Sequence, residues 1–100
     1  MLFELVVLLR KLRPTLLVYG AHMELAKPTI KDGLEWCIKR GATEIKVHPY
    51  MLAPGRHATE DIPRLVNESM SAYPNIKYEV TDPLGVDEAL GNLILKRSKL

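Results

Sequence analysis

The chain has 100 residues, of which 47% are hydrophobic and 26% charged, and its formal net charge is +2. These values are typical of one globular domain or part of one, and the small, evenly spread charge argues against a nucleic-acid partner. The single cysteine, Cys37, excludes an internal disulfide and a multi-cysteine metal site, and we expect it to fill a helix core in a reducing compartment.

Residues 1–13 have apolar side chains at helical spacing and predict a helix that Pro14 ends. The acidic Glu4 and the short uncharged run at 5–9 argue against a signal peptide. The run is also far short of the roughly 20 residues that span a bilayer. We therefore expect no targeting signal in this chain and no membrane partner.

Residues 15–19 predict a short strand, followed by a loop at residues 20–24. Pro28 suits a first helical turn, and the helix that follows should end at Gly41. Its expected apolar face consists of Ile30, Leu34, Cys37 and Ile38.

Residues 44–52 predict a buried strand, in which His48 should be packed. After a loop, Thr59 is the expected N-cap of a helix with acidic residues in its first turn, where the helix dipole favours negative charge. Its buried face should consist of Ile62, Leu65, Val66 and Met70. Residues 76–80 alternate as a further strand, and a last helix begins near residue 86.

This alternation of helices and strands indicates an α/β fold with a parallel sheet and right-handed crossovers. In such folds ligands bind at the carboxyl ends of the strands, where the loop at residues 49–63 lies. Pro54 and Gly55 bend this loop, and Gly55 can adopt positive φ and leave room for a ligand. Arg56 supplies a cation and His57 an imidazole that can bind a metal.

Three segments in this order resemble the small sirohydrochlorin chelatases of the CbiX and SirB type. They are His22–Ile30, Leu52–His57 with Thr59–Pro63, and Asp82–Gly85. These enzymes insert cobalt or ferrous iron into a modified tetrapyrrole. The resemblance implies a three-layer chelatase-like half-domain with a short, mainly parallel sheet of three recognisable strands and four helices.

Small chelatases open with a strand that ends in a Gly-His-Gly-Ser-Arg type loop, and its histidine is understood as a metal ligand. This chain starts at the helix that follows such a loop. We therefore expect residues 1–100 to form a single chelatase domain that is incomplete at its N-terminus.

The resemblance also implies roles for particular residues. His57 falls on the family's second metal-binding histidine, and both His57 and Glu24 are candidate catalytic groups, with Glu24 taking pyrrole protons or escorting the metal. Lys27, where relatives usually have glutamate at a position associated with substrate binding, would either pair with substrate carboxylates or be a surface change in a chain no longer under catalytic constraint. The guanidinium of Arg56 would also suit substrate carboxylates. His22 should have a structural role. The macrocycle would lie against the backbone of Leu52, Ala53, Pro54, Gly55 and Arg56.

The implied function is insertion of Fe²⁺ or Co²⁺ into sirohydrochlorin by a lyase-class chelatase, without a nucleotide and as a homodimer. Neutral imidazole suits both ions, so the ligand type does not select the metal. The compartment would be the plastid stroma in a plant and the cytoplasm otherwise. Because the first histidine motif is absent, we expect weak activity or none. The alternative is a non-catalytic truncated isoform that binds tetrapyrrole or a partner subunit.

Overall fold

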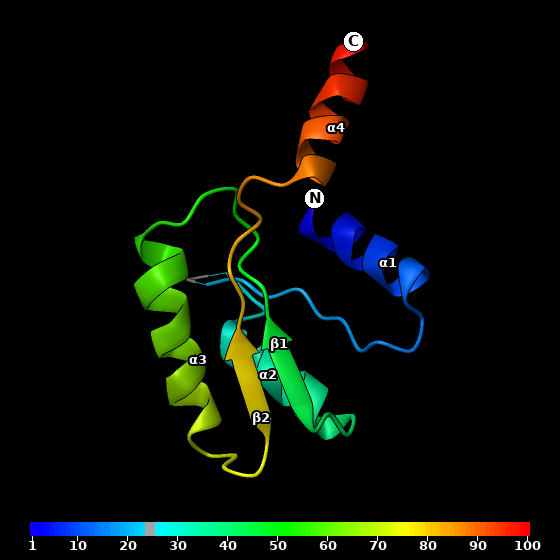
Figure 1. The fold of residues 1–100 in the computed structure, drawn as a ribbon. Helices are drawn as coiled ribbons and strands as arrows, with labels where there is room; N and C mark the ends of the chain where they lie inside the picture. Colours follow the sequence, from blue (N-terminus) through cyan, green and yellow to red (C-terminus); the bar gives the residue numbers. More distant parts are fainter. Residues whose placement is uncertain (24–25) are drawn as a thin grey trace.

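The computed structural model describes residues 1–23 and 26–100 of the chain and confirms the α/β class with four helices (Figure 1). None of the helices in these residues is long and apolar enough to cross a membrane. In chain order the elements are α1 (Leu2–Leu12), α2 (Ile30–Lys39), β1 (Glu44–Val47), a π-helical turn η1 (His57–Asp61), α3 (Ile62–Met70), β2 (Lys77–Val80) and α4 (Glu88–Ser98).

The two strands β1 and β2 are parallel and adjacent, with Glu44 opposite Lys77 and Val47 opposite Val80. Helix α3 forms the crossover between them, as the alternation of elements predicted (Figure 1). On one face of this pair the Lys46 ammonium lies 2.8 Å from a Glu79 carboxylate oxygen, and both side chains are exposed. Because successive side chains of a strand point to opposite faces, the face opposite these charged side chains is the apolar one, and it packs against the helices.

The core lies between the apolar side of β1 and helices α2 and α3. Full burial of an aliphatic side chain contributes about 1.5–3 kcal/mol, and Val66 and Met70 of α3 are almost completely buried. The predicted helix faces are therefore largely confirmed. The buried cluster consists of Leu34, Ile45, Ile62, Val66 and Met70.

Helix α2 begins with a capping box. The Thr29 hydroxyl accepts a hydrogen bond from the Asp32 backbone N–H at 3.2 Å, and the Asp32 carboxylate accepts one from the Thr29 N–H at 3.0 Å. Pro28 therefore lies just before the helix and not in its first turn, which corrects the sequence prediction. Gly41, at φ 92°, ends the helix region as expected, because this left-handed conformation favours glycine.

The predicted strand at residues 15–19 is wrong. A strand requires a hydrogen-bonding neighbour, and no strand of the described residues runs beside this segment, so the sheet there has two strands and not three. The Val18 carbonyl instead accepts two hydrogen bonds from the Arg10 guanidinium, at 3.1 and 2.6 Å. Helix α1 packs closely on Gly20, where an added Cβ would lie 3.0 Å from side-chain carbons of Leu2 and Val6.

Trp36 connects this amino-terminal segment to α2. Its ring centroid lies 4.8 Å from that of Tyr19, which belongs to the segment after α1. The Arg40 guanidinium lies over the indole at 4.0 Å, and that of Arg10 lies 5.7 Å from the ring centroid. Cation–π contacts at such distances stabilise the arrangement of the three side chains around the indole.

Candidate metal site at the carboxyl end of the sheet

Strand β1 ends at Val47, five residues before the predicted end, because Pro49 has no N–H group to donate. The chain nevertheless stays beside the segment that follows β2. The Leu84 N–H donates to the Met51 carbonyl at 2.9 Å, and the Gly85 N–H donates to the Leu52 carbonyl at 2.7 Å. These bonds bring the second and third sequence motifs together at the carboxyl end of the sheet.

The helical region after the loop begins at His57, two residues earlier than predicted. Both the backbone N–H and the hydroxyl of Thr59 donate to the Gly55 carbonyl, each at 2.9 Å. Thr59 therefore lies inside the first turn and does not act as the N-cap, which corrects the prediction. As a consequence, His57 lies on a helical turn and not on the preceding loop.

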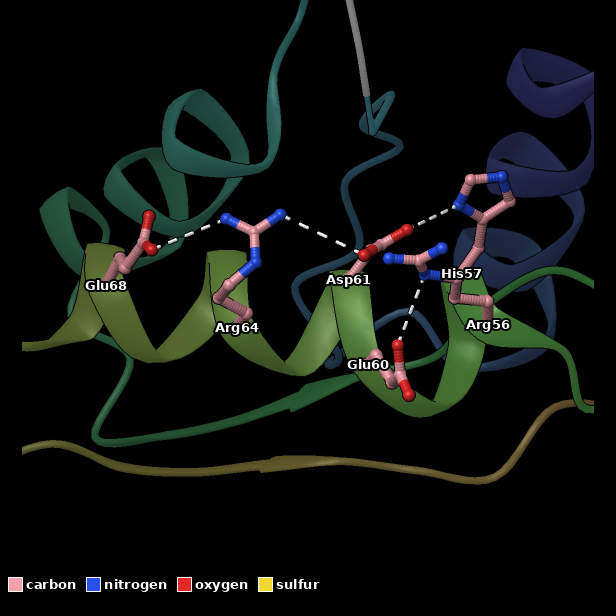
Figure 2. Close-up of polar contacts among 6 residues, drawn as sticks. All are labelled: Arg56, His57, Glu60, Asp61, Arg64 and Glu68. Atoms are coloured by element: carbon pink, nitrogen blue, oxygen red, sulfur yellow. Dashed lines mark hydrogen bonds and ion pairs between the residues drawn. The ribbon is translucent and has the colours of Figure 1, made fainter.

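The His57 side chain is 56% exposed, and its Nδ1 atom lies 2.9 Å from Oδ2 of Asp61 (Figure 2). An ionised carboxylate only accepts hydrogen bonds, so Nδ1 must be the donor. The neutral ring then carries its lone pair on Nε2. An exposed imidazole in this state presents one nitrogen to a divalent metal ion.

Asp61 was not predicted as a site residue. Its spacing of four residues from His57 places the two side chains on one helix face, but only if the helix begins at His57. Its second carboxylate oxygen lies 3.9 Å from Arg64, and Arg64 lies 3.4 Å from Glu68. Figure 2 shows these four side chains in a row along η1 and α3.

Arg56 projects from the same turn and forms an ion pair with Glu60 at 3.2 Å (Figure 2). Both side chains are largely exposed, at 81% and 67%. Exposed pairs of this kind are weak, so Arg56 can exchange Glu60 for the carboxylate of a ligand.

The loop backbone proposed to lie against a ligand is open to solvent. Leu52, Ala53, Pro54 and Gly55 are all exposed. Gly55 does not use the positive φ that is open to glycine, but a Cβ added there would meet no atom within 4 Å. The expected space at this position is therefore present.

The other candidate residues of the sequence belong to other segments of the chain or lie outside the described residues. Glu24 belongs to the two residues that the structure does not describe. Lys27 is exposed. The backbone N–H of His22 donates to the Pro28 carbonyl at 2.7 Å, which closes the first motif into a loop. His48 is exposed and not packed as predicted, because it follows the end of β1 and lies 3.1 Å from the Thr81 hydroxyl.

A pocket of about 390 Å³ lies between α1 and residues 19–28. Its volume falls in the usual range for small-ligand pockets. His22 and Arg10 are its chargeable lining residues, and its other walls are Leu2, Phe3, Val6, Tyr19, Gly20 and Pro28. Residues 52–57 do not line it, so the candidate metal turn lies on an open surface and not in this pocket.

Within residues 1–23 and 26–100, no three His, Cys, Asp or Glu side chains come together in a group that could enclose a metal ion. Cys37 is half-buried, and this burial raises the pKa of its thiol, which disfavours the thiolate that metals bind. At this turn the geometry supplies one exposed imidazole, that of His57, with one carboxylate partner, Asp61. The chain is thus an α/β protein with an accessible histidine in the turn that follows its sheet.

Comparison with known proteins identifies the family. A family model described as CbiX matches residues 1–99, and the chain belongs to the CbiX family. It is 41% identical over 81 residues to the chloroplastic sirohydrochlorin ferrochelatase of Arabidopsis thaliana, and 38% identical over 87 residues to a sirohydrochlorin cobaltochelatase of Saccharolobus solfataricus. These alignments cover 81% of this chain, with 36% of the plant protein and 68% of the archaeal one.

The fold agrees with this assignment. The crystal structure of the sirohydrochlorin chelatase SirB from Bacillus subtilis in complex with cobalt superimposes with a TM-score of 0.80 at 33% identity. The superposition covers 97% of this chain and 43% of the SirB chain. This chain therefore spans about a third of the length of the plant relative and less than half of the SirB structure.

Proposed function

We propose that this chain takes part in the insertion of Fe²⁺ or Co²⁺ into sirohydrochlorin, with His57 as a ligand that delivers the metal. The observation that carries this proposal is the exposed imidazole of His57, hydrogen-bonded through Nδ1, in the turn that follows the carboxyl end of β1. The named activities of the ferrochelatase and cobaltochelatase relatives support the choice of reaction and of metals.

The reaction exchanges two pyrrole protons of the macrocycle for one divalent metal ion. The neutral imidazole of His57 can hold the ion and release it, because a single nitrogen ligand binds more weakly than the four nitrogens of a tetrapyrrole. The released protons need acceptors, and by resemblance we assign this task to Glu24 and His57. No nucleotide is required for this exchange.

We infer that cationic side chains bind the carboxylates at the edge of the macrocycle. Arg56 is suited to this role because its partner Glu60 is exposed and easily exchanged. Lys27 supplies a second exposed cation, at a position that the resemblance associates with substrate binding. The open backbone of Leu52 to Gly55 offers a surface on which a flat macrocycle could lie.

A titration with Co²⁺ tests the metal site. We expect His57→Ala to lose most of the metal binding of the unaltered chain, because it removes the proposed ligand. The matched control is His48→Ala, since His48 is also an exposed histidine and forms one hydrogen bond through Nδ1. Equal Co²⁺ affinity in the His57→Ala variant and the unaltered chain would refute the assignment.

A second candidate function is binding of the tetrapyrrole or of a partner subunit without catalysis. The observation that favours it is that the described residues provide no three-ligand metal cluster. Comparing sirohydrochlorin binding with sirohydrochlorin turnover distinguishes the two functions.

We further propose a homodimer, and the plastid stroma as the compartment if the source is a plant and the cytoplasm otherwise. Sedimentation and imaging of a fluorescent fusion test these two points.

A further inference from the structure

We propose that Asp61 is a positioning residue that holds His57 in the tautomer with its proton on Nδ1, leaving Nε2 free for the metal. This inference rests on the proposed metal-binding function of His57. It assigns a role to a residue that does not itself contact the ion.

The first support is the contact between the two side chains. His57 Nδ1 and Asp61 Oδ2 are 2.9 Å apart, within the range of a charge-assisted hydrogen bond. Asp61 is only 23% exposed while His57 is 56% exposed, so the carboxylate is the more fixed partner and the ring the more accessible one. The carboxylate thus restricts both the tautomer and the orientation of an otherwise solvent-exposed ring.

The second support is the set of ion pairs behind Asp61. Arg64 lies 3.9 Å from Oδ1 of Asp61, the oxygen that does not face His57, and Arg64 also lies 3.4 Å from Glu68. This places a guanidinium on the Oδ1 side of Asp61 and leaves Oδ2 to accept the hydrogen bond from His57. Figure 2 shows that the row ends at His57, whose Nδ1 atom faces Asp61.

The third support is general metal-site chemistry. A histidine that binds a metal usually donates its other ring N–H to a carboxylate or carbonyl, and removal of that partner weakens metal binding about 10- to 100-fold. In this chain the helix start at His57 produces the arrangement by spacing alone, because residues four apart share a helix face.

The experiment combines a metal-free and a metal-dependent measurement on the full chain. ¹⁵N NMR of the histidine rings, at a pH well above the ordinary range of histidine titration, reports which nitrogen carries the proton. We expect Nδ1–H for His57 in the unaltered chain and a shift toward Nε2–H in Asp61→Ala. We expect Co²⁺ binding of this variant to weaken by about 10- to 100-fold.

The matched control is Glu60→Ala, which removes one negative charge from the same turn, because Glu60 pairs with Arg56 and not with His57. This variant should keep the Nδ1–H tautomer. If Asp61→Ala fails to fold, Asp61→Asn replaces it, since the amide can turn its NH₂ toward Nδ1 and favour the other tautomer.

Two results would overturn the inference. An unchanged tautomer in both Asp61 variants would show that Asp61 does not set the state of the ring. A changed tautomer with unchanged Co²⁺ affinity would show that the tautomer does not matter for the metal. In the second case the Co²⁺ affinity of His57→Ala shows which proposal is wrong. If His57→Ala binds Co²⁺ as well as the unaltered chain does, the proposed metal-binding function of His57 is wrong. If His57→Ala binds Co²⁺ more weakly, only the proposed role of Asp61 is wrong.

Discussion

At the scale of single residues, the candidate site depends on the solvent-exposed backbone of the loop at residues 52–55. Gly55 has no atom within 4 Å of the place where a Cβ would stand, and its φ is not positive. Gly85, which donates to the Leu52 carbonyl, has a φ of 63°. The two glycines therefore differ. The backbone conformation favours glycine at position 85, whereas at position 55 the absence of a side chain leaves space beside the backbone.

We therefore predict that Gly55→Ala leaves stability almost unchanged but weakens tetrapyrrole binding, because the new methyl group would stand where the macrocycle approaches the backbone. The control Gly85→Ala should instead lower stability by about 1 kcal/mol or more, since alanine is strained at positive φ. Urea unfolding and a tetrapyrrole binding titration measure the two effects. Unimpaired binding by Gly55→Ala would show that the macrocycle does not lie against this residue.

The placement of His57 after the carboxyl end of a strand could be predicted from sequence, because a strand pattern, a Pro-Gly bend and a helical pattern occur in that order. The partner Asp61 could not be predicted, since the helix was expected to begin at Thr59. Only the observed hydrogen bonds of Thr59 to the Gly55 carbonyl show that the helical turn already includes His57. Because the predicted helix began two residues too late, the contact between His57 and Asp61 was not predicted.

At the scale of elements, helices were predicted more accurately than strands because a helix satisfies its hydrogen bonds within itself. The capping pair Thr29 and Asp32 fixes the start of α2 by local chemistry. The segment 15–19 is β-prone, but a strand also requires a partner that the segment's own sequence does not contain. In the structure its Val18 carbonyl bonds to Arg10 instead.

The capping box predicts a dependence of stability on pH. The hydrogen bond from the Thr29 backbone N–H lowers the pKa of Asp32 below its ordinary value of 3.8. A carboxylate with a lowered pKa stabilises the fold above its unfolded-state pKa, and this stabilisation is lost as the pH falls through the folded-state pKa. Asp32→Asn should therefore be less stable than the unaltered chain at pH 7, and the difference should shrink as the pH falls below 3.8.

Urea unfolding of both proteins at neutral and acidic pH measures this difference. Thr29→Ala independently removes the other side chain of the same capping box, and it should lower the free energy of unfolding by about 1 kcal/mol at neutral pH. A stability difference between Asp32→Asn and the unaltered chain that does not change with pH would contradict the role of the Asp32 charge.

At the scale of the whole molecule, the chain has the CbiX fold but spans only part of its relatives. It superimposes on 43% of the SirB chain and aligns with 36% of the plant ferrochelatase. The alternation of elements was enough to predict the parallel α/β arrangement. The number of strands was not predictable in this way, because pairing depends on contacts between distant segments.

We predict that this chain alone turns over sirohydrochlorin with Co²⁺ or Fe²⁺ far more slowly than Bacillus subtilis SirB. His57 must serve as metal ligand without a three-ligand group around it in the described residues. Loss of one positioned proton-transfer group usually lowers rates about 10²- to 10⁴-fold. An anaerobic absorbance assay of metal insertion measures both proteins under the same conditions. A rate equal to that of SirB would contradict the prediction and show that this chain is sufficient for metal insertion.

Trp36, which contacts Tyr19 and Arg40, gives the molecule an intrinsic fluorescent probe. It is the only tryptophan in the chain, so its emission comes from this one environment. Detachment of the amino-terminal segment from α2 would expose the indole to water and shift its emission to longer wavelength. Fluorescence spectroscopy without any label can therefore follow that rearrangement separately from events at His57.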